Sequence, residues 1–502
     1  MACQVLVMDC GATNVRSIVV DDSGRLLAAA SRTNTPVDQP GRPGMKIWDI
    51  DEIWAKLVQT AREVLSKVKA ADVQAVTVTT FGADGAPVKK DGTLVYPVIS
   101  WACSRTQELV TGITELMSAK DIFLKTGYQI ISFNTLLRWL WLRRHEPGVL
   151  EKAHTFLMTP GLLSFRLTGE FSMDTSIAST TMGMDLARRA WSNEMLKLAD
   201  LEPGFFPPLV EPGTVIGNVT AAAASETGLP KGIPVVAAGH DTQFAPIGSG
   251  VAPGEAVLST GTWEIAMLRV GKFRPTNFGF EEGLIIETDA LKGLWDPQML
   301  MMGSGMLEWL SRHFYAALGD RADKYSVMIS EASKIPLGSD GVTIVPSFMA
   351  GTGPAKKFGT LGTIAGLTLS TSPAHVYRAA LEGLSYQLRD ALRILSKANN
   401  FAPAGLRVVG GGSKNDLWNH IRAEVTGLPV TTVSHKEATV LGAAIIAFVG
   451  AGFFKSVQEA QSKISFGENV FEPSSDRARY GALFENYMSI PKALSGFYGG
   501  KA

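Results

Sequence analysis

The chain has 502 residues, of which 46% are hydrophobic and 19% are charged. This length exceeds what one hydrophobic core usually organises, and the composition excludes disordered, collagen-like and coiled-coil proteins. Lys plus Arg equal Asp plus Glu at 47 each, so no net charge attracts nucleic acid or an anionic membrane, and a small molecule is the expected partner.

The cysteines and the apolar runs indicate where the protein resides. Cys3, Cys10 and Cys103 have neither C-x-x-C spacing nor a disulfide framework, which is typical of the reducing cytoplasm. The N-terminus shows no secretion signal, and the run Val440–Phe454 is shorter than the ~20 residues that cross a membrane. We therefore expect a cytoplasmic protein, not bound to a membrane, that buries a helix at this run. The sequence leaves open whether the chain forms a homo-oligomer.

The chain opens with short apolar strands. Val5–Met8 ends in Asp9 and a turn of small residues, after which Val15–Val20 reads as a second strand. A tight turn leads into Arg25–Ala30, which completes an antiparallel meander. Asp9 therefore lies at the edge of this meander.

Helices and strands then alternate. Apolar residues recur at helical spacing over Asp49–Val68, and Val73–Thr80 returns to strand character, which predicts the α/β fold class. A second unit begins with the strand Ala256–Leu258 and continues as Glu264–Leu268 after a turn, like the opening unit. This similarity suggests an internal duplication, with a boundary at the Gly/Pro cluster of residues 245–255.

Three turns of small and hydroxyl residues follow apolar strands. They are Asp9–Asn14, Ser259–Thr262 and Gly410–Ser413, the last between the strand Leu406–Val409 and the helix Asn415–Thr426. Such turns can bind phosphate because their backbone N–H groups are unobstructed, although a single glycine turn is usually only a turn. The P-loop and dinucleotide motifs are missing from the sequence, so nucleotide binding would have to come from these turns.

Gly239-His240-Asp241 follows the apolar strand Pro234–Ala238, at the strand end where α/β proteins commonly bind ligands. Asp241 is therefore the leading catalytic candidate. An equally good interpretation from spacing alone is that Asp241 caps the segment beginning at Thr242. His240 by itself more often has a structural role.

A sugar pocket is suggested by three further residues. Asp84 is free for ligand binding because the hairpin signal fits Asp91-Gly92 better. Trp101 and Arg105 follow another strand, where an aromatic ring can stack on a sugar and an arginine can donate to its hydroxyls. Core packing and a surface ion pair are the simpler alternatives. The seven histidines show no zinc-site spacing, which leaves a loosely held magnesium.

Taken together, these motifs resemble those of the FGGY carbohydrate kinases, a branch of the sugar kinase, Hsp70 and actin superfamily. Asp9–Arg16 is similar to the family's first phosphate motif and Gly239–Asp241 to its catalytic motif. Ser259–Trp263 is similar to the second phosphate motif, and Gly410–Ser413 to the adenosine motif. The resemblance spans most of the chain, and the order of the four motifs makes it specific.

The resemblance implies two duplicated actin-like (ribonuclease H-like) ATPase domains with a ligand cleft between them. Residues 1–245 would form the sugar and phosphate side, residues 246–450 the nucleotide side, and residues 451–502 a helical tail packed on the second domain. The implied reaction is phosphorylation of a small sugar by ATP with Mg²⁺, in which the domains close over both ligands to exclude water.

The resemblance also assigns roles to residues. Asp241 would be the general base, and Asp9 and Asp241 would hold Mg²⁺. The nucleotide would be bound by Gly11, Thr13, Asn14, Arg16, Thr260, Gly261, Thr262, Gly411, Gly412, Ser413 and Asn415. The sugar pocket would be lined by Asp84, Trp101, Arg105, His240 and Asp241.

Within the family, stretches such as DCGATNVR, TTFGADG, AGHDTQFA and VGGGS are most similar to the branch that phosphorylates L-fuculose at its C1 hydroxyl. The first motif departs from many members because it reads Gly11-Ala12-Thr13, an alanine that the L-fuculose and L-rhamnulose branches also carry. L-Rhamnulose, L-ribulose and D-xylulose are alternative substrates. An actin-like or Hsp70-like ATPase acting on a protein partner, and a sugar-binding regulator without activity, are alternatives from other classes.

Overall fold

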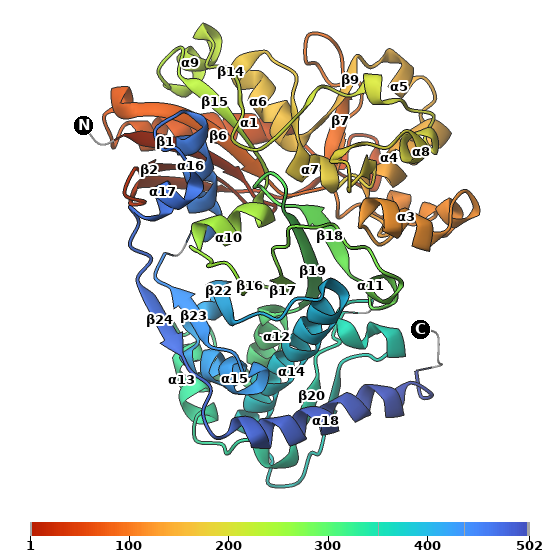
Figure 1. The fold of residues 1–502 in the computed structure, drawn as a ribbon, viewed down its shortest axis with the longest axis vertical. Coiled ribbons are helices and arrows are strands. Elements are labelled where there is room, and N and C mark those ends of the chain that lie inside the picture. Colours follow the sequence, from red (N-terminus) through yellow and green to blue (C-terminus); the bar gives the residue numbers. More distant parts are fainter. Residues whose placement is uncertain (1–2, 350, 436, 499–502) are drawn as a thin grey trace.

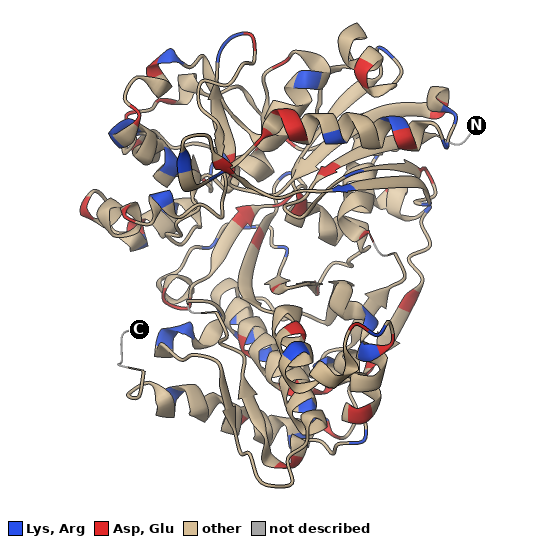
Figure 2. Cartoon of the chain, turned by 180° about the vertical axis from the view of Figure 1, so that it is seen from behind, with Lys and Arg blue, Asp and Glu red and all other residues tan. Residues whose placement is uncertain are grey.

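The computed structural model describes residues 3–349, 351–435 and 437–498. Two sheets, each covered by helices, form the two halves that lie one above the other in Figure 1. Charges of both signs are interspersed over the two halves in Figure 2, in line with the equal numbers of acidic and basic residues. Among the described helices, none combines the length and the apolar character needed to cross a membrane.

The first sheet has six strands in the order β14-β15-β6-β1-β2-β3 within the described residues. Their bounds are β1 (Gln4–Cys10), β2 (Asn14–Asp21), β3 (Leu26–Thr33), β6 (Val73–Thr80), β14 (Val215–Asn218) and β15 (Pro234–His240). β1 pairs antiparallel with β2 and parallel with β6, which in turn is parallel to β15. β2 also pairs antiparallel with β3, which confirms the expected meander of β1, β2 and β3.

The second sheet repeats this design. Its seven strands follow the order β18-β19-β17-β16-β22-β23-β24 in the part of the chain that the structure describes. Their bounds are β16 (Glu255–Thr260), β17 (Trp263–Met267), β18 (Ile285–Thr288), β19 (Trp295–Met302), β22 (Gly405–Gly410), β23 (Val430–Val433) and β24 (Glu468–Phe471). Because β16 pairs antiparallel with β17 and parallel with β22, it occupies the place that β1 has in the first sheet.

Helices cover both sheets through their apolar faces. α1 (Ile50–Leu65) begins at Asp49, whose carboxylate accepts from two backbone N–H groups of the first turn, and it buries residues such as Leu57 and Val64 on the first sheet. α14 (Pro373–Asn399) packs on the second sheet together with α15 (Asp416–Thr426). The other helices of this half are α11 (Asn277–Glu281), α12 (Ser304–Phe314) and α13 (Lys324–Ala332).

A group of small strands and helices adjoins the first sheet, and most of it lies between β6 and β14 in the sequence. Small strands β7 (Gly85–Val88) and β9 (Thr155–Met158) pair there, and β4 (Val37–Gln39), β5 (Arg42–Trp48) and β8 (Val98–Ile99) form a further small sheet. Its helices are α2 (Leu109–Gly112), α3 (Ala119–Thr126), α4 (Thr135–His145), α5 (Val149–Lys152), α6 (Thr159–Thr168), α7 (Thr175–Ser179) and α8 (Asn193–Lys197). The expected turn at Asp91-Gly92 is present, since Lys89 N donates to Thr93 O across it.

The chain crosses between the two halves three times, after residues 248, 433 and 461, and this changes one expectation. α16 (Ala438–Gly450) is the buried helix predicted at Val440–Phe454. It packs on β1, β6 and β15 of the first sheet. The expectation that all of residues 246–450 belong to the second domain is therefore wrong for this helix. Figure 1 shows this blue helix beside the red and orange strands. α17 (Val457–Gln461) packs with it, whereas β24 and α18 (Arg477–Leu494) lie on the second half. Apolar residues of α16 cover the lower face of the first sheet, which would otherwise be exposed.

α16 also contacts α10 (Ala245–Gly248), which leaves the first sheet just after Asp241. The two helices approach so closely that a Cβ atom at Gly248 would overlap the carbonyl oxygen of Ala438. A Cβ atom at Gly442 would likewise overlap the carbonyl oxygen of Phe244. Glycine is therefore required at both positions for this backbone-to-backbone contact.

We expect Gly442→Ala to lower the free energy of unfolding by about 1–3 kcal/mol, because the added methyl group has no space between the two helices. Urea unfolding followed by circular dichroism measures the change. Gly112→Ala on α2 is the matched control, because a Cβ atom there meets nothing within 4 Å. Equal stabilities of the two variants would contradict the close contact.

Candidate active site

The carboxyl ends of three parallel strands meet in the cleft between the two halves. β1 ends at Asp9, β6 leads into Phe81–Asp84, and β15 ends at His240 and Asp241. A cavity of about 280 Å³ lies at these ends. The first half lines it with Ala12, Phe81, Gly82, Ala83, Trp101, Tyr128, Phe133, Thr180, His240, Asp241 and Thr242, and the second half with Ile265, Ile285, Glu287, Gln298 and Leu300.

Asp241 presents one carboxylate oxygen to the protein. Oδ1 accepts from the backbone N–H of Thr242 at 2.6 Å and from its hydroxyl at 3.2 Å, while Oδ2 accepts from no described residue. Burial raises the pKa of Asp241, and attraction to His240 offsets only part of that rise. The capping interpretation is wrong, because the short helix Asp241–Phe244 has His240 at its N-cap and no side-chain cap, and among the described residues the Asp241 carboxylate hydrogen-bonds only to the next residue. The Asp241 carboxylate also lines the cavity.

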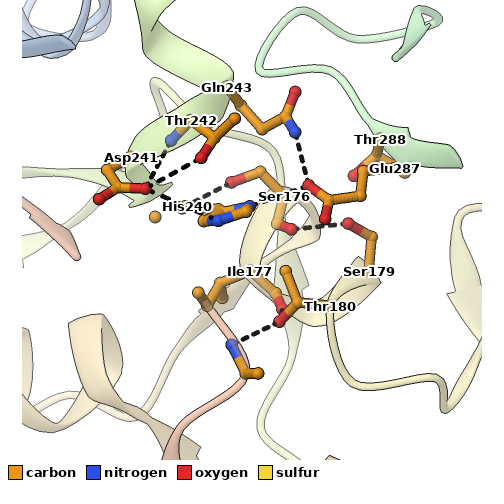
Figure 3. A network of polar contacts seen from close by, with 12 residues as sticks. Ser176, Ile177, Ser179, Thr180, His240, Asp241, Thr242, Gln243, Glu287 and Thr288 are labelled. Atoms are coloured by element: carbon orange, nitrogen blue, oxygen red, sulfur yellow. Dashed lines mark hydrogen bonds and ion pairs between the residues drawn. The ribbon is translucent and has the colours of Figure 1, made fainter. Parts of the chain in front are cut away.

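Figure 3 shows how His240 is joined to the second half through Glu287. Nδ1 of His240 and the side-chain amide of Gln243 both bond to Oε2 of Glu287, at 2.8 Å and 2.5 Å, and the hydroxyl of Tyr128 donates to Oε1. Burial lowers the pKa of His240, but the carboxylates of Glu287, Asp241 and Asp174 outweigh it and raise the pKa to about 9. His240 is therefore a cation at neutral pH, with Nε2 3.6 Å from Oδ1 of Asp241.

Two glycines make room for this imidazolium. A Cβ atom at Gly82 would lie 2.9 Å from Nε2 of His240. Gly239 has a φ of 143°, which other residues rarely adopt, and a Cβ atom there would overlap the Asp174 carboxylate. The glycines of the Phe81–Asp84 turn and of the Gly-His-Asp motif are therefore required by the local geometry.

Asp9 is held by Arg16, its partner across the β1–β2 pair. Nε of Arg16 donates to Oδ2 of Asp9 at 2.9 Å, and Nη2 donates to the same oxygen. Burial raises the pKa of Asp9 to about 6, with a further rise from the nearby Asp241 carboxylate. Gly11, Thr13 and Asn14 form the turn between the strands, where Gly11 N donates to the carbonyl oxygen of Asn14 at 2.9 Å.

The two predicted nucleotide turns of the second half lie side by side because β16 and β22 are parallel neighbours. Gly261 and Thr262 are accessible, whereas Thr260 is buried and its hydroxyl accepts from Arg422 at 3.3 Å. Arg422 in turn pairs with Glu264 at 2.5 Å, and both side chains are fully buried. The structure therefore makes Thr260 a support of the turn instead of a ligand contact.

A second cavity, of about 370 Å³, adjoins the Gly410–Ser413 turn. It is lined by Val409, Gly410, Gly411, Ser413, Lys414, Thr432, Val433, Ser434 and His435. Gly412 and Asn415 are buried behind it, and Oδ1 of Asn415 caps α15 by accepting from Trp418 N at 3.1 Å. Gly411 and Ser413 are thus the predicted adenosine residues that reach the cavity.

The structure corrects two predicted sugar contacts. Asp84 is fully buried and accepts from Trp48 Nε1 at 2.6 Å, Trp101 N at 2.9 Å and Arg138 Nη1 at 2.5 Å, so it fixes Trp101 from behind the cavity wall. Arg105 is also buried. It donates to Gln39 at 3.0 Å and stacks over a tryptophan of α4, away from the cavity.

Glu287 is the main residue that the sequence interpretation missed, together with Tyr128, Phe133 and Gln298. The available signal was a carboxylate inside the apolar run Leu284–Thr288, where an acidic residue is costly to bury unless it has partners. That signal indicates a buried polar contact but does not say which residues provide it. His240, which the resemblance placed in the sugar pocket, provides one of them.

The acidic residues fit a magnesium ion. Oδ1 of Asp9 and Oδ2 of Asp241 both lack a hydrogen-bond donor among the described residues. The two carboxylates are close enough that the charge of Asp241 raises the pKa of Asp9, and a cation between them would relieve this repulsion. No group of three or more His, Cys, Asp or Glu suited to a metal occurs in the described residues. Mg²⁺ is commonly bound by one or two carboxylates together with substrate phosphates and water, and Asp9 and Asp241 are the two carboxylates available for it here.

Two domains of the same strand design, with acidic strand ends facing glycine turns across a cleft, define a duplicated actin-like ATPase fold. The sequence model for the N-terminal domain of the FGGY family of carbohydrate kinases matches residues 4–248, and that for the C-terminal domain matches residues 256–451. The chain therefore belongs to the FGGY family of carbohydrate kinases and is a sugar kinase.

Relatives and solved structures agree with this placement. The L-fuculokinase of Escherichia coli K12 is 39% identical over 94% of this chain and 98% of its own length. The autoinducer-2 kinase of Klebsiella pneumoniae is 28% identical over 97% of this chain and 92% of its own. The crystal structure of xylulose kinase from Rhodospirillum rubrum has the same fold, with a TM-score of 0.89 at 24% identity over 99% of both chains.

We expect Glu287→Gln to lower stability in a pH-dependent way. The pKa of Glu287 is lowered from 4.5, and the pKa of His240 is raised from 6.5 to about 9. The ion pair between them therefore contributes fully to stability between about pH 4.5 and 6.5. Its contribution is lost as the pH rises through about 9. The difference in unfolding free energy between wild type and variant should therefore shrink from pH 6.5 to 9 in urea titrations.

The matched control is Glu382→Gln. Glu382 is also buried with several donors, but its charged partner is Arg378, and arginine stays protonated in proteins. Its effect should stay constant from about pH 7 to 9. A constant effect of Glu287→Gln over the same range would contradict a charged His240.

Proposed function

We propose that this kinase transfers the γ-phosphoryl group of ATP to the C1 hydroxyl of L-fuculose. The observation that supports this substrate most is the 39% identity to an L-fuculokinase over nearly the full length of both chains. The cavity supports the same class of sugar. Its volume of about 280 Å³ suits one six-carbon ketose.

The walls of the cavity favour a deoxy sugar. Phe81, Phe133, Ile265, Ile285 and Leu300 give it an apolar lining, which is unusual for a fully hydroxylated ligand. L-Fuculose and L-rhamnulose each carry a methyl group at C6, whereas L-ribulose and D-xylulose have no such group. Burying that methyl group against apolar side chains would contribute about 1 kcal/mol in favour of the 6-deoxy ketoses.

Polar groups at one end of the cavity would orient the sugar. The imidazolium of His240 offers Nε2–H to a hydroxyl oxygen, and the indole ring of Trp101, 42% exposed, can stack on the sugar face. Asp84 fixes the backbone of Trp101 from behind. This arrangement would leave the C1 hydroxyl facing Asp241.

Asp241 would act as the general base. Its Oδ2 has no donor from the described residues and can accept the proton of the C1 hydroxyl as that oxygen attacks the γ-phosphorus and the bond to ADP breaks. Burial raises the pKa of this carboxyl, which brings its basicity closer to that of a base working at neutral pH. Asp9 and Asp241 would hold Mg²⁺, which supplies charge neutralisation at the phosphates.

The turns of both halves would bind the nucleotide. The N–H groups of Gly11 and Gly261 are already bonded within their turns, so the exposed residues Thr13 and Thr262 would hold the phosphates. The cavity at Gly411 and Ser413 would take the adenosine. Closure of the two halves over both ligands would exclude water from the transferred group.

Asp241→Asn is expected to lower kcat by about 10² to 10⁴, the usual range for losing a general base. ADP release from Mg-ATP in the presence of L-fuculose measures it. Asp121→Asn on the exposed face of α3 should leave kcat unchanged. Near-normal turnover of Asp241→Asn would rule out the assigned base.

A substrate panel tests the sugar. We expect kcat/KM to be highest for L-fuculose, lower for L-rhamnulose, and lowest for L-ribulose, D-xylulose and glycerol, which lack the C6 methyl group. Autoinducer-2 belongs in the panel because a 28% identical relative is an autoinducer-2 kinase. A pentulose as the best substrate would reject the 6-deoxy assignment, and ATP turnover that needs no sugar would favour the actin-like or Hsp70-like alternative.

A further inference from the structure

Arg16 is held by two carboxylates that come from opposite ends of the chain. Nε and Nη2 donate to Oδ2 of Asp9, whereas Nη1 donates to Oε2 of Glu437 at 2.7 Å. Asp9 and Arg16 face each other on β1 and β2, and Glu437 immediately precedes α16. The arginine that the first phosphate motif supplies therefore has its donors divided between two acids.

Glu437 occupies a special place in the fold. It lies where the chain passes from β23 of the second sheet to α16 on the first sheet, so it belongs to one of the three crossings between the halves. A cavity of about 380 Å³ adjoins both Arg16 and Glu437. Their side chains are 29% and 32% exposed, and ion pairs exposed to this degree contribute little to stability. Stability alone is therefore a weak reason for this contact.

The contact has a clear consequence for Asp9. An arginine next to a carboxylate often takes both oxygens through two parallel hydrogen bonds. Arg16 instead takes only Oδ2, and Oδ1 accepts from none of the residues described. Glu437 holds Nη1, so the guanidinium meets Asp9 through its Nε–Nη2 edge, and both donors of that edge lie on the same oxygen.

We propose that Glu437 is a positioning residue for phosphoryl transfer, which holds Arg16 on one oxygen of Asp9 and so leaves Oδ1 free for the divalent cation and its water. The inference rests on the proposed function, because it assigns Asp9 to the cation. Without the Glu437 carboxylate, the guanidinium is free to turn, engage both oxygens of Asp9 and compete with the cation. Glu437 acts through Arg16 and does not itself touch the cation or the sugar.

The experiment compares Glu437→Gln, Arg16→Gln and the double variant. The Mn²⁺ affinity of the ADP-bound protein is measured by electron paramagnetic resonance, without sugar or turnover. We expect Glu437→Gln to weaken Mn²⁺ binding about tenfold, the size of one charge-assisted hydrogen bond. In the Arg16→Gln background the same change should have no effect, because no guanidinium remains to compete.

Controls separate positioning from structure. Glu63→Gln removes a carboxylate that pairs with Arg32 on the outer side of the first domain and should leave Mn²⁺ affinity unchanged. Glu437→Asp, whose shorter side chain falls away from Arg16, should reproduce the loss if Glu437→Gln does not fold. Unchanged Mn²⁺ affinity, or an equal loss with and without Arg16, would overturn the inference.

The two proposals fail in different ways. Absence of sugar-dependent ADP release in the wild-type protein would remove the proposed function, but it would leave the comparison of Mn²⁺ affinities intact. Conversely, the wild-type protein could phosphorylate the sugar while Glu437→Gln leaves Mn²⁺ affinity unchanged. That result would support the proposed function and reject the positioning role of Glu437.

Discussion

The relative position of the two sheets depends on a close backbone contact between α10 and α16. α10 continues from the turn that begins at Asp241, and α16 covers the first sheet after the chain has returned from the second. Gly248 and Gly442 allow the helices to approach until backbone meets backbone. Since both segments lead directly to a crossing, this contact sets where Asp241 stands relative to the Ser259–Thr262 and Gly410–Ser413 turns of the other half.

The polar groups of the cleft are held by other buried polar groups, both across the two halves and within the first half. Glu287 of the second half fixes His240 of the first, while Asp84 and Arg138 fix Trp101. Burying an ionised group is costly unless it is paired and hydrogen-bonded. These pairs therefore keep the site charged but rigid, which suits phosphoryl transfer, a reaction that depends on positioning and charge neutralisation.

Several strands of each half and the opening meander could be predicted from the sequence, because apolar periodicity and turn residues are local signals. The meander around Asp9, the strand Val73–Thr80 and the cap and end of α15 at Asn415 and Gly427 all follow from neighbours in the sequence. The motifs at Asp9 and His240-Asp241 were found in the same way, and the structure brings both to the cleft.

Features that depend on distant residues could not be predicted. Asp84 and Thr260 looked like ligand contacts because their turns reach the cleft, but Arg138 and Arg422 engage their side chains from helices far along the chain. Glu287 became a site residue only through contact with His240, Gln243 and Tyr128. The placement of α16 was missed for a similar reason, since a uniformly apolar helix does not indicate which sheet it will cover.

The return of α16 to the first sheet means that the order of the sequence and the order of the folded parts differ. A fragment ending near residue 245 would carry all six strands of the first sheet, yet Val5, Val7, Val236 and Ala238 would lose the apolar cover that α16 provides. The two halves are thus unsuited to separate expression if the chain is cut between residues 248 and 256, where the two family models meet. The same topology makes them suited to fragment complementation, because a late segment completes the early domain without a covalent link to it.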